Sequence, residues 1–164
     1  MLRRLALAAV LVGSTILLGC THEQGGTAQL ETTLPPGYGF HYLDEGGSAK
    51  LAFGQANSDN VGLMLQCAKG SRVVEVSDLV RSNSAPTMTL ASGGQRSDMK
   101  VEVQPGPSSA IAVGRAPLGS PALAGFRKSG QIEVTYAGLH YAVAAKPQDR
   151  ASLDRFFTAC DRPA

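Results

Sequence analysis

The sequence predicts a mainly β fold, either an antiparallel β-sandwich or an open barrel, with one C-terminal helix packed on it. Short segments in which apolar and polar residues alternate recur along the chain, separated by turn-forming residues. The 19 glycines and 9 prolines are spread through the sequence, which favours many turns over long helices. A clear helical period of apolar residues occurs near the C-terminus, in the stretch LDRFFTAC.

Eight segments carry the alternation typical of strands. They are 49–55, 61–68, 72–76, 86–92, 99–105, 109–115, 131–136 and 139–145. In 99–105, Met99, Val101 and Val103 share one face, and in 109–115 Ile111 and Val113 do so. A polar opposite face is typical of antiparallel strands with one side in water. We therefore expect seven or eight short, mostly antiparallel strands.

Turns and the terminal helix complete the prediction. The stretches 56–60, 92–96 and 137–138 are turn sequences between neighbouring strands. Segment 121–130 is compatible with a loop or with one turn of helix. Pro147 opens the C-terminal helix, where a proline in the first turn is tolerated. On that helix an apolar stripe forms at spacings of three and four residues, from Leu153, Phe156, Phe157 and Cys160.

The N-terminus has the plan of a secretory signal. Arg3 and Arg4 precede an apolar run, Leu5–Leu18, that is shorter than the roughly 20 apolar residues of a membrane-spanning helix. The run ends in LLGC, Leu17–Cys20. This stretch resembles the lipobox of bacterial lipoproteins, with apolar residues, a small Gly19 and then the acceptor Cys20.

The resemblance implies cleavage between Gly19 and Cys20, a diacylglycerol on the Cys20 thiol, and a fatty acyl (palmitate) chain on the new N-terminus. Several acyl chains make a durable membrane anchor, whereas one chain binds only marginally. In proteobacterial lipoproteins, a residue such as Thr21 after the acceptor implies delivery to the outer membrane, so we expect a domain that faces the periplasm. The alternatives are an ordinary signal peptide with a chance cysteine, or an uncleaved anchor.

Composition divides the remaining chain into a tether and one domain. We expect 1–19 to be the signal peptide, 20–36 a polar flexible tether, and 37–164 a single β-rich domain. The chain has 15 Lys and Arg residues and 13 Asp and Glu residues, and removal of Arg3 and Arg4 leaves 13 of each. A neutral mature chain gives no electrostatic case for nucleic-acid binding.

The cysteine count predicts a disulfide. With Cys20 as the acyl acceptor, Cys67 and Cys160 remain in an oxidising compartment, where a pair is normally bonded. Each continues an apolar stripe, Cys67 on a strand and Cys160 on the terminal helix, so the bond would join that helix to the sheet. The alternatives are two buried free thiols, or a redox or metal role, although neither cysteine belongs to a C-x-x-C motif.

The sequence contains no recognisable catalytic or metal motif. Neither G-x-S-x-G nor H-E-x-x-H occurs. In the turn 56–60, Asp59 is the only charged residue, which is too few carboxylates for a typical calcium loop. We therefore predict no catalytic residue, no metal and no cofactor.

Two functional hypotheses follow. The first is a lipid-anchored, non-enzymatic binding or scaffold module that holds another envelope protein or a glycan. Tyr38, Phe40 and Tyr42 alternate near the start of the domain and form a candidate binding face, unless they pack in the core.

The alternative hypothesis is an envelope hydrolase. It would use His41 with Asp44 or Glu45 as acid and base groups. Such chemistry requires a cleft that brings these side chains within hydrogen-bonding reach of a substrate.

Overall fold

The computed structural model describes residues 36–80, 84–106 and 109–162. The predicted signal peptide, the acceptor Cys20 and nearly all of the tether lie outside these residues. The fold given below is that of these described residues. Among the described residues, no helix has both the length and the apolar character needed to cross a membrane.

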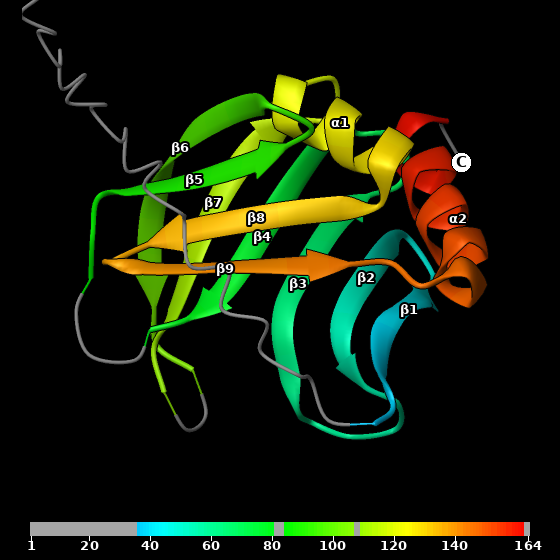
Figure 1. The fold of residues 1–164 in the computed structure, drawn as a ribbon, viewed down its shortest axis with the longest axis horizontal. Coiled ribbons are helices and arrows are strands. Elements are labelled where there is room, and N and C mark those ends of the chain that lie inside the picture. The colour runs from blue at the N-terminus through cyan, green and yellow to red at the C-terminus, as the bar shows by residue number, and fades with distance from the viewer. Residues whose placement is uncertain (1–35, 81–83, 107–108, 163–164) are drawn as a thin grey trace, which may run out of the picture. The chain divides into compact units, whose positions relative to one another are not determined.

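One antiparallel sheet of nine strands curls into a half-barrel (Figure 1). Its strands lie in the order β1-β2-β3-β4-β7-β6-β5-β8-β9. Their bounds are Tyr38–Glu45, Ser48–Gln55, Val61–Ala68, Val73–Leu79, Thr87–Ser92, Gln95–Gln104, Ile111–Pro117, Gln131–Tyr136 and Leu139–Ala144 for β1 to β9. The helix α2, Arg150–Asp161, follows a short 3₁₀ turn, Pro147–Asp149. The predicted mainly β fold with a helix at the C-terminus is therefore confirmed, in its open-barrel form.

Hairpins and two longer connections, from β4 to β5 and from β7 to β8, produce this order. Strands β1 to β4 pair consecutively and β5 to β7 do the same, while β7 pairs with β4 and β8 pairs with β5. The turn after β5 places Gly93 and Gly94 at φ 56° and 75°, and the turn after β8 places Ala137 and Gly138 at 48° and 82°. Two consecutive positive φ values match the twist of the flanking strands in a two-residue hairpin.

Two elements were not identified from the sequence. β1 was recognised only as an alternating aromatic segment, yet it pairs with β2 along its whole length, from Tyr38↔Gln55 to Glu45↔Ser48. The segment left open between loop and helix forms α1, Pro121–Ser129, which begins with proline and ends at Gly130 with φ 76°. Its buried side chains Ala122, Leu123 and Phe126 have helical spacing, so packing stabilises a helix that is short for its own propensity.

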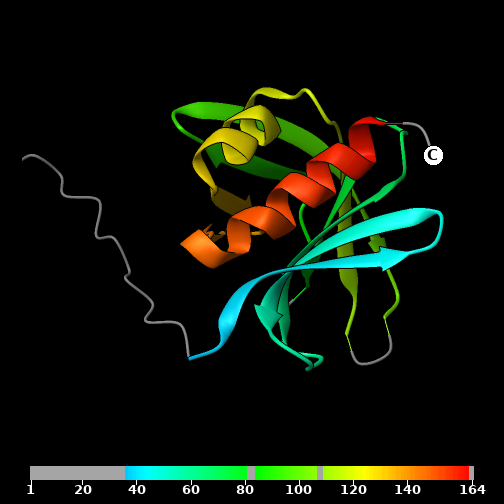
Figure 2. The ribbon, with the colours of Figure 1, turned by 90° about the vertical axis from the view of Figure 1, so that its right-hand side faces the viewer.

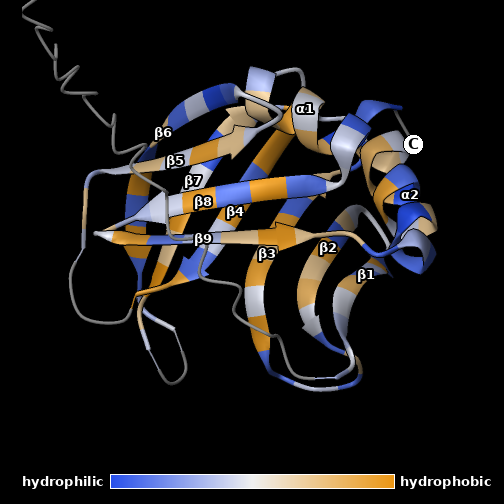
Figure 3. Ribbon diagram, viewed as in Figure 1, coloured by the Kyte–Doolittle hydropathy of each residue, from blue (hydrophilic) through white to orange (hydrophobic). Residues whose placement is uncertain are grey.

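The core lies between the concave face of the sheet and the two helices. Four aromatic contacts connect β1, α1 and α2 through the interior: Phe40–Phe53 at 5.0 Å, Phe40–Phe126 at 5.2 Å, Phe126–Phe157 at 5.9 Å and Phe156–Phe157 at 5.5 Å between ring centroids. Figure 3 shows the alternation of apolar and polar residues along β8, whose apolar side faces this core. The predicted stripe of α2 is completely buried.

Strand β7 turns its smallest residues to the core. Ala112 and Ala116 are buried there, whereas Ile111 and Val113 share the opposite face. A Cβ atom at Gly114 would lie 2.4 Å from the Sδ atom of Met99, so the methionine fills the space beside β7. Val113 on the opposite face is also buried, at 7% exposed, so β7 is covered on both sides at this point.

The predicted disulfide between Cys67 and Cys160 is confirmed. The two Cα atoms are 5.8 Å apart, and the bond joins β3 to α2. Beside it, the amide of Gly70 donates to the carbonyl of Ala159 at 2.9 Å, and the amide of Arg72 donates to the carbonyl of Cys160 at 3.1 Å. These contacts fasten the C-terminal end of α2 to the β3–β4 turn.

The N-terminal end of α2 is held at β1. The ammonium of Lys146 donates to the carbonyl of Tyr38 at 2.5 Å. A Cβ atom at Gly39 would lie 3.1 Å from the Asp149 carboxylate, so glycine lets this carboxylate approach β1 closely. Figure 2 shows α2 running along the side of the domain on which β1 and β2 lie.

Candidate functional site

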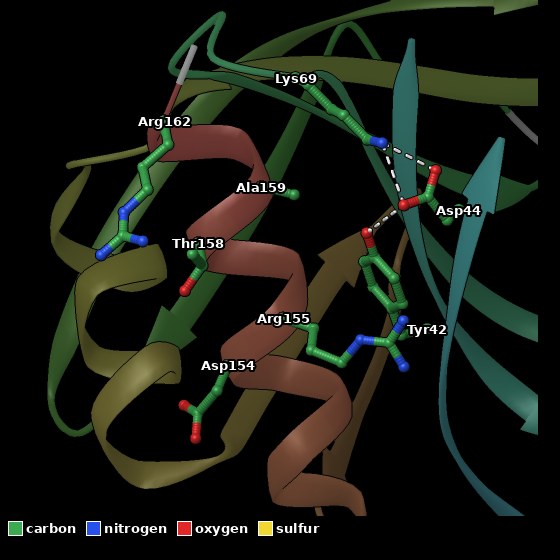
Figure 4. Close-up of a pocket in the computed structure, with 8 residues that line it drawn as sticks. All are labelled: Tyr42, Asp44, Lys69, Asp154, Arg155, Thr158, Ala159 and Arg162. Carbon is green, nitrogen blue, oxygen red and sulfur yellow. Dashed lines mark hydrogen bonds and ion pairs between the residues drawn. The ribbon is translucent and has the colours of Figure 1, made fainter. Parts of the chain in front are cut away.

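An open groove of about 480 Å³ lies between β1 and the outward face of α2 (Figure 4). From the sheet come Tyr42 and Asp44 of β1 and Lys69 of the β3–β4 turn. The helical side is formed by Asp154, Arg155, Thr158 and Ala159 of α2, followed by Arg162. Segments from the start, the middle and the end of the domain therefore meet here.

Local periodicity explains why these side chains face the groove. Along β1, alternation places Phe40, Tyr42 and Asp44 on one face, with Phe40 in the core and Asp44 exposed. On α2, the buried stripe directs the intervening residues outwards. The small side chain of Ala159 leaves space between the longer polar side chains on either side of it.

A chain of polar contacts fixes the sheet side of the groove. The Lys69 ammonium lies 2.8 Å and 3.0 Å from the two carboxylate oxygens of Asp44. The hydroxyl of Tyr42 donates to the same carboxylate at 3.3 Å. The hydrogen bond from Lys69, aided by the one from Tyr42, lowers the pKa of Asp44 below its usual value. Asp44 is therefore ionised and already paired at neutral pH.

The helix side contributes charges that lack such partners. The guanidinium of Arg155 lies 4.3 Å from the centroid of the Tyr42 ring, in a cation–π contact. Within the described part of the chain, the side chains of Arg155, Arg162 and Asp154 form no hydrogen bond or ion pair. Because Lys69 and Asp44 neutralise each other, the unpaired groups are two cations and one carboxylate.

The structure separates the three aromatic residues that formed the candidate binding face. Phe40 is 1% exposed and belongs to the aromatic core, so it is not available to a ligand. Tyr38 is partly buried, with its ring 6.0 Å from that of Phe53. Only Tyr42 lines the groove. Alternation on a strand that lies against the core turned the expected aromatic face inwards.

The proposed acid and base groups of the hydrolase hypothesis do not converge. His41 and Asp44 lie on opposite faces of β1, since they are three residues apart on a strand. The Nε2 atom of His41 is 3.2 Å from the carbonyl oxygen of Gly54, and Asp44 is paired with Lys69. Glu45 forms its own ion pair with Lys50 at 2.7 Å.

A second polar cluster, on the outer face of the β8–β9 hairpin, was not foreseen from the sequence. The Oγ1 atom of Thr135 is 3.0 Å from Nδ1 of His140, whose Nε2 is 3.8 Å from the Glu133 carboxylate. The cluster could have been predicted from the register of the hairpin, because the short turn at 137–138 places Thr135 opposite His140. The His140 and Glu133 side chains are 61% and 50% exposed, so this cluster lies on the open surface of the hairpin.

The side chains that could coordinate a metal ion are dispersed over the described part of the domain. Among the described residues, no group of three or more His, Cys, Asp or Glu side chains could hold a metal ion. The stretch 56–60 is a turn in which the Ser58 hydroxyl donates to the Gln55 carbonyl and accepts from the Asn60 amide. Turn formation accounts for its polar residues.

Comparison of the chain with models of known protein families, with curated proteins and with solved structures yields no match. The functional argument therefore depends on the sequence and on the geometry of the groove.

Proposed function

We propose that this protein is a lipid-anchored, non-enzymatic binding module of the bacterial envelope, and that the groove between β1 and α2 is its binding site. The N-terminal LLGC stretch supports an anchor at Cys20, and Thr21 directly after it supports delivery to the outer membrane, with the domain facing the periplasm. The observation that carries the binding role is the groove itself, in which two unpaired cations and an aromatic ring lie together.

The chemistry of the groove supports binding over catalysis. Asp44 is a weak base because its pKa is lowered and its oxygens are occupied by Lys69 and Tyr42. The guanidinium groups of Arg155 and Arg162 offer hydrogen-bond donors and no acceptor. These groups can hold and orient a ligand.

Site-specific photo-cross-linking in cells tests the binding site. A photoreactive amino acid replaces Thr158, which lines the groove, in the full chain. The matched control carries it at Thr135, an exposed residue on the outer face of β8. We expect a discrete cross-linked adduct from position 158 and none from position 135. If both positions give the same adducts, the groove is not the binding site.

Intact mass and fractionation test the anchor separately. Wild type is expected in the membrane fraction, beginning at Cys20 and carrying acyl mass. The Cys20→Ser variant is expected to lose that mass and to leave the membrane. If the wild-type protein is soluble and unacylated, LLGC is only the end of an ordinary signal peptide. That result would contradict the proposed lipid anchor.

A further inference from the structure

The guanidinium of Arg155 contacts an aromatic ring while its hydrogen-bond donors remain unused. Its carbon lies 4.3 Å from the centroid of the Tyr42 ring, and a cation–π contact of this kind does not use the N–H donors of the guanidinium. None of the described residues accepts a hydrogen bond from them. A planar guanidinium with free edge donors matches the two oxygens of a carboxylate, which it can bind through two parallel hydrogen bonds.

The nearest carboxylate on the sheet side of the groove is already paired. Asp44 accepts a hydrogen bond from the Tyr42 hydroxyl, and its two oxygens are bound by Lys69 at 2.8 Å and 3.0 Å. Lys69 therefore satisfies Asp44, which forms no ion pair with Arg155. The Tyr42 hydroxyl bond helps to position the ring that Arg155 contacts.

The other unpaired groups define what kind of anion fits. Arg162 supplies a second unpaired cation, while Asp154 is an unpaired carboxylate of the same groove (Figure 4). A monoanionic carboxylate gains from the two arginines and is repelled only modestly by Asp154. A phosphate with up to two negative charges is both attracted more strongly by the arginines and repelled more strongly by Asp154 and Asp44, so charge alone does not separate the two anions. The groove is open along the helix, which suits side chains presented by an extended segment.

From this arrangement we infer that the groove binds side-chain carboxylates of an acidic polypeptide segment, and that Arg155 is the residue that holds them. This inference rests on the proposed binding function and names its ligand chemistry. Arg162 provides the second contact, and Tyr42 positions Arg155.

Titration with two model peptides tests the ligand chemistry. The full chain, with its disulfide intact and in nonionic detergent, is titrated with acetyl-tetraglutamate amide or with the uncharged acetyl-tetraglutamine amide. The signal of the Arg155 Nε–H group is followed by NMR. We expect saturable shifts with tetraglutamate only, and weaker binding as salt is added, because surface electrostatic attraction is screened. Equal binding of the two peptides would overturn the inference.

Two arginine variants test the residue. Arg155→Gln is expected to weaken tetraglutamate binding about tenfold, the loss typical of a charge-assisted hydrogen bond. Arg127→Gln is the matched control, because Arg127 also stacks on an aromatic ring, that of Phe157 at 5.6 Å, but lies outside the groove. Its binding is expected to equal that of wild type. Equal losses in both variants would assign the attraction to overall charge and would overturn the role of Arg155.

Inorganic phosphate, added at matched ionic strength, separates the two anion chemistries. Phosphate binding as tight as that of tetraglutamate would overturn the carboxylate assignment. The cross-linking at position 158 keeps this test distinct from the binding function itself. If position 158 forms an adduct in cells and tetraglutamate does not bind, the groove remains a binding site and only the acidic ligand is wrong.

Discussion

The guanidinium carbon of Arg155 lies 4.3 Å from the centroid of the Tyr42 ring, so helix α2 and strand β1 meet through one cation–π contact at the groove. The helix is also held at both ends, by Lys146 at Tyr38 and by the disulfide at Cys160. Groove geometry is therefore a consequence of how α2 docks on the sheet. The same contacts that stabilise the fold define the candidate site.

The Tyr42 ring is expected to matter more for ligand binding than for stability. Tyr42→Leu removes the stacking surface, so tetraglutamate affinity should fall about threefold to tenfold, while stability changes by about 0.5–1 kcal/mol, the range of an exposed cation–π contact. Tyr42→Phe keeps the ring and should bind within about twofold of wild type. NMR titration and urea unfolding measure the two effects. Full affinity in Tyr42→Leu would show that stacking does not position Arg155.

The disulfide is expected to be the largest single covalent contribution to stability. It closes a loop with a sequence separation of 93, for which the chain-entropy model gives about 4–5 kcal/mol. Replacement of Cys67 and Cys160 together by alanine should lower the free energy of unfolding by about this amount in urea. Dithiothreitol should destabilise wild type and leave the double variant unchanged. A double variant as stable as oxidised wild type would contradict the prediction.

Gly125 tests the packing of α1 against the sheet. Alanine at a helical position is favoured over glycine by about 1 kcal/mol. Here, however, the new Cβ would lie 2.7 Å from the backbone carbonyl oxygen of Ser92, which is 2% exposed and cannot move freely. We expect Gly125→Ala to destabilise the protein by about 1–2 kcal/mol net, since overpacking outweighs propensity.

Gly119 provides the control for this substitution. A Cβ atom at Gly119 meets no atom within 4 Å, so Gly119→Ala should change stability by less than about 0.5 kcal/mol. Thermal unfolding of both variants compares the two sites. A stabilised Gly125→Ala protein would mean that α1 sits farther from β5 than the structure places it.

The pairing of Asp44 with Lys69 predicts a specific pH dependence. The folded-state pKa of Asp44 is below its usual value of 3.8, chiefly through the Lys69 hydrogen bond. The stabilisation is therefore complete above the unfolded-state pKa and is lost as the pH falls through the lower folded-state pKa. In Lys69→Met, the pKa of Asp44 should rise towards 3.8, and the stability difference from wild type should shrink as the pH drops below that value.

Carboxyl-carbon NMR titration measures this change, with Asp98 as the internal reference. Its pKa is lowered by hydrogen bonds from Thr89 and Arg96 and should not respond to Lys69→Met. An unshifted Asp44 in the variant would show that Lys69 is not its main partner in solution.

Strand β1 shows that alternation in the sequence identifies the two faces of a strand but not which face is buried. The alternation of Tyr38, Phe40 and Tyr42 was visible in the sequence, but whether Phe40 faced solvent or core depended on α1 and α2, whose Phe126 and Phe157 fill the space beside it. On β7, Ile111 and Val113 share one face as the alternation indicates, but Ala112 and Ala116 of the other face belong to the core cluster, where Met99 lies close to Gly114.

Local chemistry alone determined the strand class, the hairpin turns, the buried stripe of α2 and the pairing of Cys67 with Cys160. Periodicity and turn propensity act between residues near in sequence, and two core-facing cysteines leave one intramolecular partner each. The order in which β4 meets β7, the helix α1 and the meeting of Arg155 with Tyr42 were decided only by the tertiary structure. Such contacts depend on how all buried surfaces pack together, because the free energy that places one distant segment beside another is shared among many side chains.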